Sequence, residues 1–264
     1  MSLGKQVRLN RIFAHPSGRL CSVAIDHFMV YDLGLPAGLR DVRATLAAVM
    51  QGRPDAVTLH KGMAAALWPP YAGQVPLILQ TSGVRPDDSA LENFGAVEEA
   101  LRLGADGLAV VAFVRGATEA LYLRRVADYV REAGRYELPV ICHVYPRNIE
   151  TMQIIFNPED IAWATRCAVE VGADVVKVPY CGDLTAHAQI AAECPVPLVA
   201  AGGPKTETLA AALQLMADAV ACGVRGATIG RNIWGVDDIT GALRAFKAVI
   251  HDGLTPAQAL TAGQ

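Results

Sequence analysis

Several features are missing or scarce in this chain of 264 residues. Only 19% of the residues are charged, basic residues form no run, and the formal net charge is −3, so nothing favours binding to a nucleic acid or another polyanion. The longest apolar run, residues 107–114, is far too short to cross a bilayer. The N-terminal residues carry charges with no continuous apolar stretch behind them, which argues against a signal peptide. We expect a cytoplasmic protein with no membrane partner and no nucleic-acid partner.

The cysteines also lack any paired spacing. Six are scattered along the chain among mostly apolar neighbours, with no Cys-x-x-Cys pair (Cys21, Cys142, Cys167, Cys181, Cys194 and Cys222). Paired cysteines are typical of zinc sites and of the disulfide frameworks of small secreted domains. We therefore expect reduced, mostly buried thiols.

What the chain does have is a regular alternation of short apolar runs and amphipathic stretches. Hydrophobic residues make up 52% of the sequence, enough for one large core. Eight β-rich runs lie at 20–26, 56–61, 76–80, 107–113, 139–144, 174–179, 197–201 and 226–230. The clearest helical stretches lie at 41–50, 96–103, 119–133, 158–171, 185–192 and 206–221. In 119–133, for example, the apolar stripe consists of Ala120, Leu121, Leu123, Val126 and Val130.

This alternation predicts a parallel sheet covered by helices on both faces. Eight strand–helix units in about 250 residues fit a (β/α)8 TIM barrel, which we expect to form a single domain over residues 1–264. A doubly wound open sheet is the competing fold. It would need a glycine-rich nucleotide-binding turn after the first strand, and residues 25–29 contain no glycine.

Polar and ionisable residues gather where the predicted strands end. Barrel active sites lie at this edge, which is built from the loops that lead from strands into helices. The strand-end residues include Asp26, His27, His60, Lys61, His143, Tyr145, Arg147, Lys177, Lys205 and Arg231. The opposite turns hold mostly Gly, Ala, Pro and Asp. We therefore expect the functional site at the carboxyl ends of the strands.

Lys177 lies near the end of a short, nearly all-apolar strand. Apolar surroundings disfavour the ammonium ion, lower its pKa and leave a neutral amine, which can condense with a carbonyl to form a Schiff base. On this segment alone, a lysine that extends to solvent is the alternative. Lys205 and Lys61 compete for the same role. A glycine-rich turn should keep Lys205 charged, and Lys61 is less enclosed, so Lys177 is the favoured nucleophile.

Two strand ends have the composition of phosphate sites. Residues 201–205 read Ala-Gly-Gly-Pro-Lys, and we expect them to enter a helix with Pro204 near its first position. Residues 230–232 read Gly-Arg-Asn and add a guanidinium that can hold phosphate oxygens. Glycines let backbone N–H groups approach an anion, and the loops after the last two barrel strands commonly bind phosphate. A tight turn without a ligand is the alternative for each.

Two more side chains have the chemistry to assist a lysine. Tyr145 can donate and accept a proton, and a half-buried rim tyrosine is its alternative role. Asp26 can accept a hydrogen bond from the lysine amine or move a proton, and a helix cap is its alternative role. Asp26, His27, His60 and His143 could instead converge on a metal ion. No His-x-His pair or other tight ligand spacing supports that site.

Together these segments resemble the class I aldolase superfamily that includes archaeal-type fructose-bisphosphate aldolase, with deoxyribose-phosphate and tagatose-bisphosphate aldolases as more distant relatives. The matching pieces are 24–27, 144–147, 175–180, 201–205 and 230–234. The resemblance implies a Schiff base on Lys177, acid–base chemistry by Tyr145 and an active-site role for Asp26. It places the phosphate on the two glycine segments, and the expected substrate-binding and phosphate-binding residues are Gly202, Gly203, Lys205, Gly230, Arg231, His27 and Arg147.

The resemblance also implies a phosphorylated ketose or related sugar as the small-molecule partner, no metal or other cofactor, and assembly as a homo-oligomer. The chain departs from the family pattern at 28–31, where the family has a glycine after Asp-His, and at Asn148. Acidic residues in 81–88 do not favour a second phosphate, although Arg85 could bind one, so fructose 1,6-bisphosphate is not the expected substrate. Alternatives are transaldolase-like or thiolase-like fragment transfer, a metal-dependent aldolase and a non-catalytic sugar-phosphate sensor.

Overall fold

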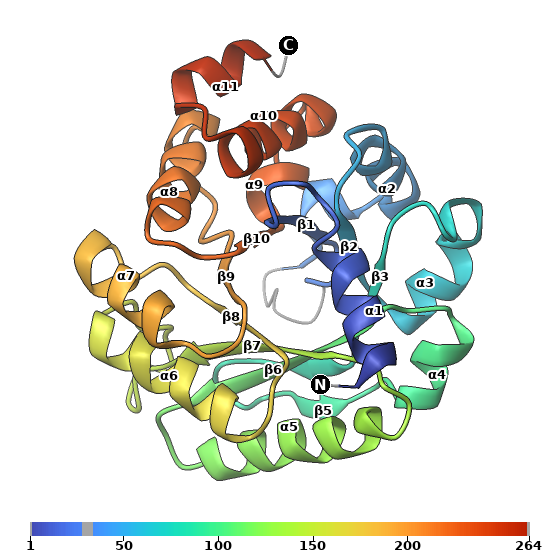
Figure 1. Ribbon diagram of the computed structural model, residues 1–264, viewed down its shortest axis with the longest axis vertical. Helices are drawn as coiled ribbons and strands as arrows, with labels where there is room; N and C mark the ends of the chain where they lie inside the picture. The colour runs from blue at the N-terminus through green and yellow to red at the C-terminus, as the bar shows by residue number, and fades with distance from the viewer. Residues whose placement is uncertain (1, 28–33, 263–264) are drawn as a thin grey trace.

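The expected barrel is present in a computed structural model, which describes residues 2–27 and 34–262. Eight parallel strands pair in the order β1-β10-β9-β8-β7-β6-β3-β2 and close on themselves, so the (β/α)8 prediction is confirmed (Figure 1). They are β1 (Leu20–Ala24), β2 (Ala56–His60), β3 (Leu77–Gln80), β6 (Gly107–Val114), β7 (Val140–Pro146), β8 (Val175–Val178), β9 (Leu198–Ala201) and β10 (Gly226–Ile229). Each predicted strand overlaps one of these.

Helices surround the barrel as its outer layer (Figure 1). They are α1 (Leu3–Ile12), α2 (Val42–Gln51), α3 (Lys61–Leu67), α4 (Val97–Arg102), α5 (Glu119–Gly134), α6 (Pro158–Glu170), α7 (Leu184–Glu193), α8 (Leu209–Ala221), α9 (Arg231–Trp234), α10 (Ile239–Asp252) and α11 (Pro256–Ala262), with 3-10 turns η2 (Ala37–Leu39) and η3 (Pro69–Tyr71). All six predicted helices are found. The sequence pattern did not predict α1, α3, α9, α10 or α11.

The buried face of α5 differs from the predicted stripe. Tyr122, Val126, Tyr129 and Ala133 are buried, whereas Leu121 is exposed. The two tyrosines bury their rings because their hydroxyl groups reach partners around the strand Leu91–Asn93. Tyr122 donates to Asp88, which precedes this strand, and Tyr129 donates to the backbone carbonyl of Gly95, which follows it. The stripe is therefore rotated toward the tyrosines.

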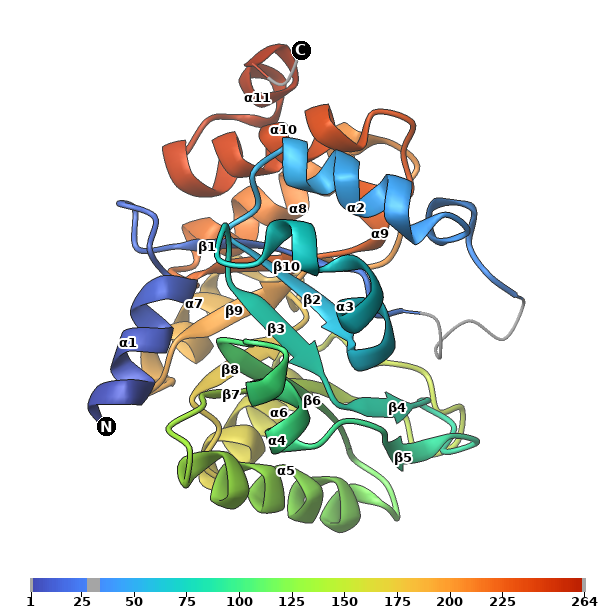
Figure 2. The same cartoon turned by 90° about the vertical axis from the view of Figure 1, so that its right-hand side faces the viewer.

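The barrel interior has an apolar floor and a polar layer above it. At the amino ends of the strands, Leu9 and Ile12 of α1 pack against Leu20, Ile78 and Ile141. Figure 2 shows α1 at one end of the barrel and the hairpin of β4 (Ser82–Val84) and β5 (Leu91–Asn93) at the other. Alternate residues of a strand face the same side, so the next inward positions form one layer. Six of them are buried and polar, namely Ser22, Thr58, Gln80, His143, Lys177 and Thr228, and the positions on β6 and β9 are Val111 and Ala201.

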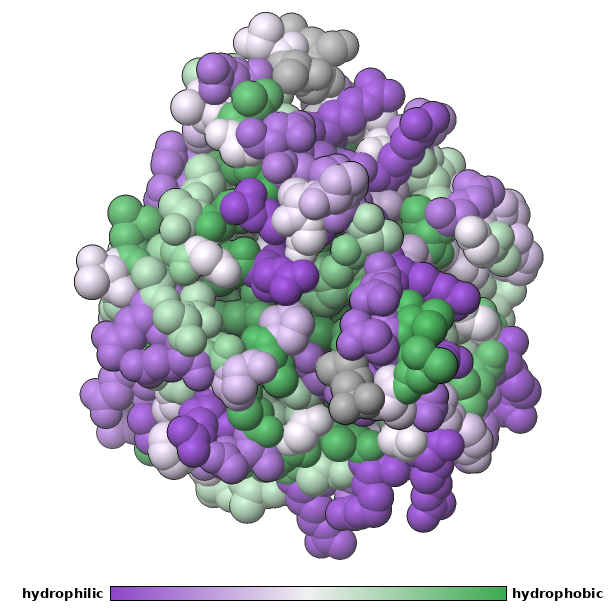
Figure 3. Space-filling view, viewed as in Figure 1, coloured by the Kyte–Doolittle hydropathy of each residue, from purple (hydrophilic) through white to green (hydrophobic). Residues whose placement is uncertain are grey.

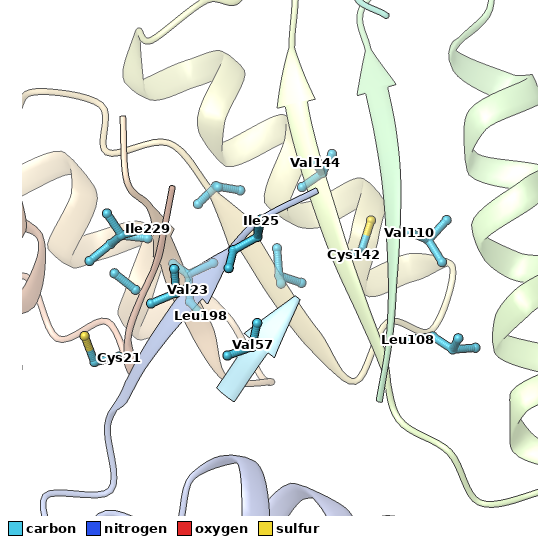
Figure 4. Packing of buried hydrophobic residues seen from close by; sticks show 14 of the residues in the cluster. Cys21, Val23, Ile25, Val57, Leu108, Val110, Cys142, Val144, Leu198 and Ile229 are labelled. Atoms are coloured by element: carbon cyan, nitrogen blue, oxygen red, sulfur yellow. The ribbon is translucent and has the colours of Figure 1, made fainter. Parts of the chain in front are cut away.

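Strand residues of the opposite parity pack against the helices and form the larger core. Val23, Val57, Val144 and Ile229 belong to this cluster, which Figure 4 shows from close by. The C-terminal apolar stretch joins it through α10, which contacts α2, α8 and β1 of its own barrel. The rigid outer core fixes the strands, and so it fixes the polar side chains at their carboxyl ends.

The surface at the α1 end mixes hydrophilic and hydrophobic residues, with hydrophilic ones prominent around the rim (Figure 3). All six cysteines are free thiols, four of them buried, as the sequence predicts. Among the described helices, none is long and apolar enough to cross a membrane.

Candidate active site

Two adjoining cavities open at the carboxyl ends of the barrel strands. The first, of about 250 Å³, is lined by the glycine segments after β9 and β10, and we call it the loop compartment. The second, of about 280 Å³, reaches into the barrel between β1, β3, β6 and β7, and we call it the barrel compartment. Both cavities are lined by His27, Tyr145, Ile154, Lys177 and Arg231. The predicted nucleophile therefore lies at the junction of the two.

Lys177 points inward from β8 and is 4% exposed. Its β7 register partner is His143, which belongs to the same inward layer. Burial and, to a lesser extent, the positive charge of Arg231 lower the pKa of Lys177 to about 8 against the opposing effect of Asp26. The environment therefore raises the fraction of neutral amine above that of an ordinary lysine, as expected from its strand.

Asp26 follows β1 and lies at the edge of the barrel compartment. Its Oδ2 atom accepts a hydrogen bond from Gln80 Nε2 at 2.7 Å, and its Oδ1 atom lies 3.2 Å from His27 Nδ1. Burial alone would raise the pKa of Asp26, but the His27 contact and the charge of Lys177 hold it well below its ordinary value. Asp26 is thus a carboxylate. Among the described residues, no hydrogen bond joins it to the lysine amine, so it acts on Lys177 through charge.

Gln80 was not among the predicted site residues, yet it orients this carboxylate. Its Oε1 atom accepts a hydrogen bond from the Ser82 N–H at 3.0 Å, which leaves Nε2 to donate to Asp26. Ser82 in turn accepts a hydrogen bond from the Val111 N–H at 3.0 Å. Gln80 could have been predicted as a site residue, because it is a polar residue at an inward position of a barrel strand.

Tyr145 lies half-buried on β7 and lines both compartments. Burial and the nearby Asp26 carboxylate raise the pKa of its phenol above the ordinary value of 10. The phenol stays protonated at neutral pH, so it can donate a proton or a hydrogen bond to a substrate oxygen. Very little phenolate is present at neutral pH to accept a proton.

The loop compartment offers donors to an anion. Among the described residues, the N–H groups of Gly203 and Gly230 have no protein acceptor, whereas Gly202 donates to the carbonyl of Thr228 at 3.0 Å. Gly203 has a φ of 72°, which favours glycine, and a Cβ on Gly230 would overlap the His27 ring. The guanidinium of Arg231 lines the same cavity. Two free N–H groups beside a cation suit a phosphate.

Asn232 shapes this compartment, although it was not among the predicted binding residues. It is 1% exposed, and its Nδ2 atom donates to the carbonyls of Gly202 at 2.9 Å and Pro204 at 2.8 Å. Its Oδ1 atom accepts a hydrogen bond from the Thr206 N–H at 3.0 Å. The segment therefore wraps around an amide, and α8 begins only at Leu209. The prediction that Pro204 starts a helix was wrong.

Two predicted binding residues do not line either compartment. Lys205 is exposed to solvent. Arg147 is fully buried and makes a two-pronged ion pair with Asp88, at 2.8 and 3.0 Å, besides donating to Thr118. Asp88 also accepts a hydrogen bond from Tyr122 at 2.8 Å. The acidic character of the 81–88 segment therefore serves Arg147, and this arginine is not placed to hold a substrate.

The other residues considered from the sequence have different surroundings. Lys61 is on the surface, where it pairs with Glu99 at 2.8 Å. His60 Nε2 lies 3.1 Å from the backbone oxygen of Asp26. Across residues 2–27 and 34–262, no group of three or more His, Cys, Asp or Glu side chains is arranged to hold a metal ion. Asn148 caps a turn by accepting the N–H groups of Glu150 and Thr151. The predicted departure at 28–31 lies outside the described residues.

Comparison with known proteins agrees with this geometry. Residues 20–235 match the model of the DeoC/LacD family aldolase. The chain is 30% identical to a 2-amino-4,5-dihydroxy-6-oxo-7-(phosphonooxy)heptanoate synthase of Streptomyces griseus over 95% of this chain and 92% of that protein. It is 31% identical to a 2-amino-3,7-dideoxy-D-threo-hept-6-ulosonate synthase of Halobacterium salinarum over 97% of this chain and 95% of that one.

A solved structure resembles the whole barrel. It is an archaeal fructose-1,6-bisphosphate aldolase whose catalytic lysine is covalently bound to the carbinolamine intermediate of its substrate. The two chains superpose with a TM-score of 0.83 at 27% identity, covering 94% of this chain and 99% of the other. The chain therefore belongs to the DeoC/LacD aldolase family and is an aldolase of class I.

Proposed function

We propose that this protein makes or breaks a carbon–carbon bond in a phosphorylated ketose or related sugar through a Schiff base on Lys177. The observation that carries the proposal is a buried lysine with a pKa of about 8 at the junction of two cavities, one of them equipped for an anion. A neutral amine attacks the ketone, and the protonated imine then accepts the electrons of the breaking bond.

The neighbouring side chains assist dehydration, stabilise the imine charge and bind the phosphate. Tyr145, kept protonated by burial, donates a proton to the hydroxyl that leaves the carbinolamine, so that the imine forms. The Asp26 carboxylate stabilises the positive charge of the imine across the barrel compartment. Gly203, Gly230 and Arg231 hold the phosphate of the ketone half in the loop compartment. The relatives support this substrate class, since one is named for a phosphonooxy product.

The barrel compartment suits a second half of the substrate, the aldehyde acceptor, that carries no phosphate. Its wall includes Val84, Pro86, Val111 and Phe113. The cations that line it within the described chain are Lys177 and Arg231, which lie at the junction, and residues 28–33 contain no lysine or arginine. An anionic acceptor would face apolar groups and the Asp26 carboxylate. We therefore propose that the acceptor is an uncharged aldehyde.

We further propose that the enzyme needs no metal or other cofactor and that it is cytoplasmic. We also propose that it assembles as a homo-oligomer, whose size sedimentation would measure.

Trapping tests the proposal directly. Borohydride reduces an imine irreversibly, so adding it with dihydroxyacetone phosphate should inactivate the protein and add the mass of the reduced adduct at Lys177. Peptide mass mapping locates the adduct. Lys61 and Lys205 serve as internal controls because both are strand-end lysines that reach solvent, Lys61 partly and Lys205 fully. An adduct on either of them, or inactivation by a chelator with no adduct at all, contradicts the proposal.

The lowered lysine pKa predicts how trapping depends on pH. With a pKa of about 8, roughly a tenth of the amine is neutral at pH 7, against less than about a thousandth for an ordinary lysine. The initial rate should therefore rise about tenfold per unit below pH 7, about fivefold between pH 7 and pH 8, and level off above pH 9. Arg231→Gln removes a charge that lowers this pKa, so its midpoint should move upward. A wild-type midpoint near pH 10 would show that the lysine is solvated.

A further inference from the structure

One buried ionisable side chain of the barrel compartment has no role in the steps above. His143 lies on β7, is 3% exposed and faces the cavity together with Asp26, Gln80 and Ser82. Within the described chain, its imidazole makes no hydrogen bond and no ion pair. Buried polar groups in proteins nearly always have a partner, so an imidazole directed into a cavity without one is suited to contact a ligand there.

The charges around His143 favour a neutral ring. Burial lowers its pKa well below the ordinary value, Lys177 on β8 and His27 after β1 act in the same direction, and Asp26 opposes them. A neutral imidazole has one nitrogen that donates a hydrogen bond and one that accepts a proton. His143 therefore presents a free base to the compartment at neutral pH.

Asp26 and Tyr145, the other candidates for this base, are less suited to accept a proton. The Asp26 carboxylate is held by Gln80 at 2.7 Å and by His27 at 3.2 Å. The pKa of the Tyr145 phenol is raised, so the phenol is protonated and cannot accept a proton at neutral pH. His143, in contrast, is the register partner of Lys177, one strand spacing of about 4.8 Å away. The two side chains therefore enter the barrel side by side from neighbouring strands, which suits a group acting on substrate atoms close to the imine.

We propose that His143 is the catalytic base of carbon–carbon bond cleavage and shuttles a single proton. In cleavage, its imidazole takes the proton of the C4 hydroxyl. The C3–C4 bond breaks, its electrons form the enamine as the protonated imine is neutralised, and C4 leaves as an aldehyde. The imidazolium then returns its proton to C3, so the ring ends neutral and no co-reactant is needed. Condensation runs the same steps in reverse. This inference rests on the proposed imine at Lys177.

The reverse direction gives two measurements that separate imine formation from proton transfer. Borohydride trapping with dihydroxyacetone phosphate reports the imine alone. Exchange of a proton for deuterium at the hydroxymethyl carbon of dihydroxyacetone phosphate, which becomes C3 of the ketose, reports the base. We expect His143→Gln to keep the trapping rate within about threefold and to slow exchange by about 10²- to 10⁴-fold, the range for loss of a general base.

Matched variants keep the test decisive. Tyr145→Phe should slow trapping, the opposite pattern, because Tyr145 acts in dehydration. His187→Gln replaces a fully buried histidine of α7 that lines neither compartment, and it should leave both rates unchanged. His143→Ala leaves a space for free imidazole, which should restore part of the exchange.

Three outcomes would overturn the proposal. Exchange at the wild-type rate in His143→Gln would assign the base elsewhere. Loss of trapping in both His143 variants would place the defect in the imine step. A His143→Ala variant that exchanges slowly and gains nothing from imidazole would leave His143 with a structural role only. Absence of trapping in the wild type is a separate result, because it contradicts the Schiff base itself.

Discussion

Lys177→Ala is expected to abolish cleavage of a phosphorylated ketose, lowering kcat/KM by about 10⁴-fold or more, as removal of a nucleophile does in other covalent enzymes. Without the amine no imine forms, and the electrons of the breaking bond have no acceptor. The fold should survive because the outer core does not involve Lys177 and Asp26 keeps its contacts with Gln80 and His27. Steady-state kinetics and circular dichroism measure the two effects.

Three controls make the result specific. Lys177→Arg keeps a positive charge in the cavity but cannot form an imine, so it should be as inactive as the alanine variant. Lys61→Ala and Lys205→Ala remove the two strand-end lysines that line neither compartment and should retain near-wild-type turnover. Substantial cleavage by Lys177→Ala, or a borohydride adduct that moves to Lys61, would assign the nucleophile to another lysine.

The position of Lys177 was predictable because it depends on local rules. An apolar strand in an alternating pattern predicts a barrel, and the carboxyl edge of a barrel collects the active-site residues. The same rules brought Asp26, His27, Tyr145 and Arg231 to the two compartments. Strand parity separates the inward Tyr145 and Lys177 from the core residues of their strands, whereas Asp26, His27 and Arg231 follow the ends of β1 and β10.

Contacts between residues far apart in the chain set the features that the sequence did not predict. A strand-end arginine can bind a substrate or a buried carboxylate, and Arg147 binds Asp88, which lies 59 residues away in the chain. A Gly-Gly-Pro segment can enter a helix at once, yet Asn232 holds residues 202–206 in a loop from 26 to 30 residues further along. The α5 stripe rotated for the same reason, since Tyr122 and Tyr129 follow partners outside the helix.

Asp88→Ala is expected to lower the free energy of unfolding by about 3–5 kcal/mol, because it leaves a fully buried guanidinium without its counterion. Arg147 keeps hydrogen bonds to Thr118 and to backbone carbonyls, but these carry no negative charge. Urea denaturation measures the loss. Asp88→Asn should cost less, since asparagine tolerates the φ of 61° at this position and keeps one acceptor oxygen.

The pH dependence of stability gives the same pair a second test. Burial raises the pKa of Asp88, but the hydrogen bonds from Arg147, Thr118 and Tyr122 outweigh it and hold the pKa below its ordinary value. A carboxyl whose folded pKa is lowered stabilises the fold above its unfolded pKa of about 3.9, and that contribution disappears as the pH falls through the folded pKa. The difference in stability between wild type and Asp88→Asn should therefore shrink below about pH 4.

Arg147→Met removes the guanidinium and separates a structural role from a substrate-binding one. Because the side chain holds Asp88 and lines neither compartment, the variant should lose stability while its KM stays near the wild-type value at a temperature where it remains folded. In the double variant Arg147→Met with Asp88→Asn neither charge is left unpaired, so it should unfold at a higher urea concentration than Asp88→Ala does. A raised KM with unchanged stability would instead return Arg147 to the phosphate, as its place after a barrel strand first indicated.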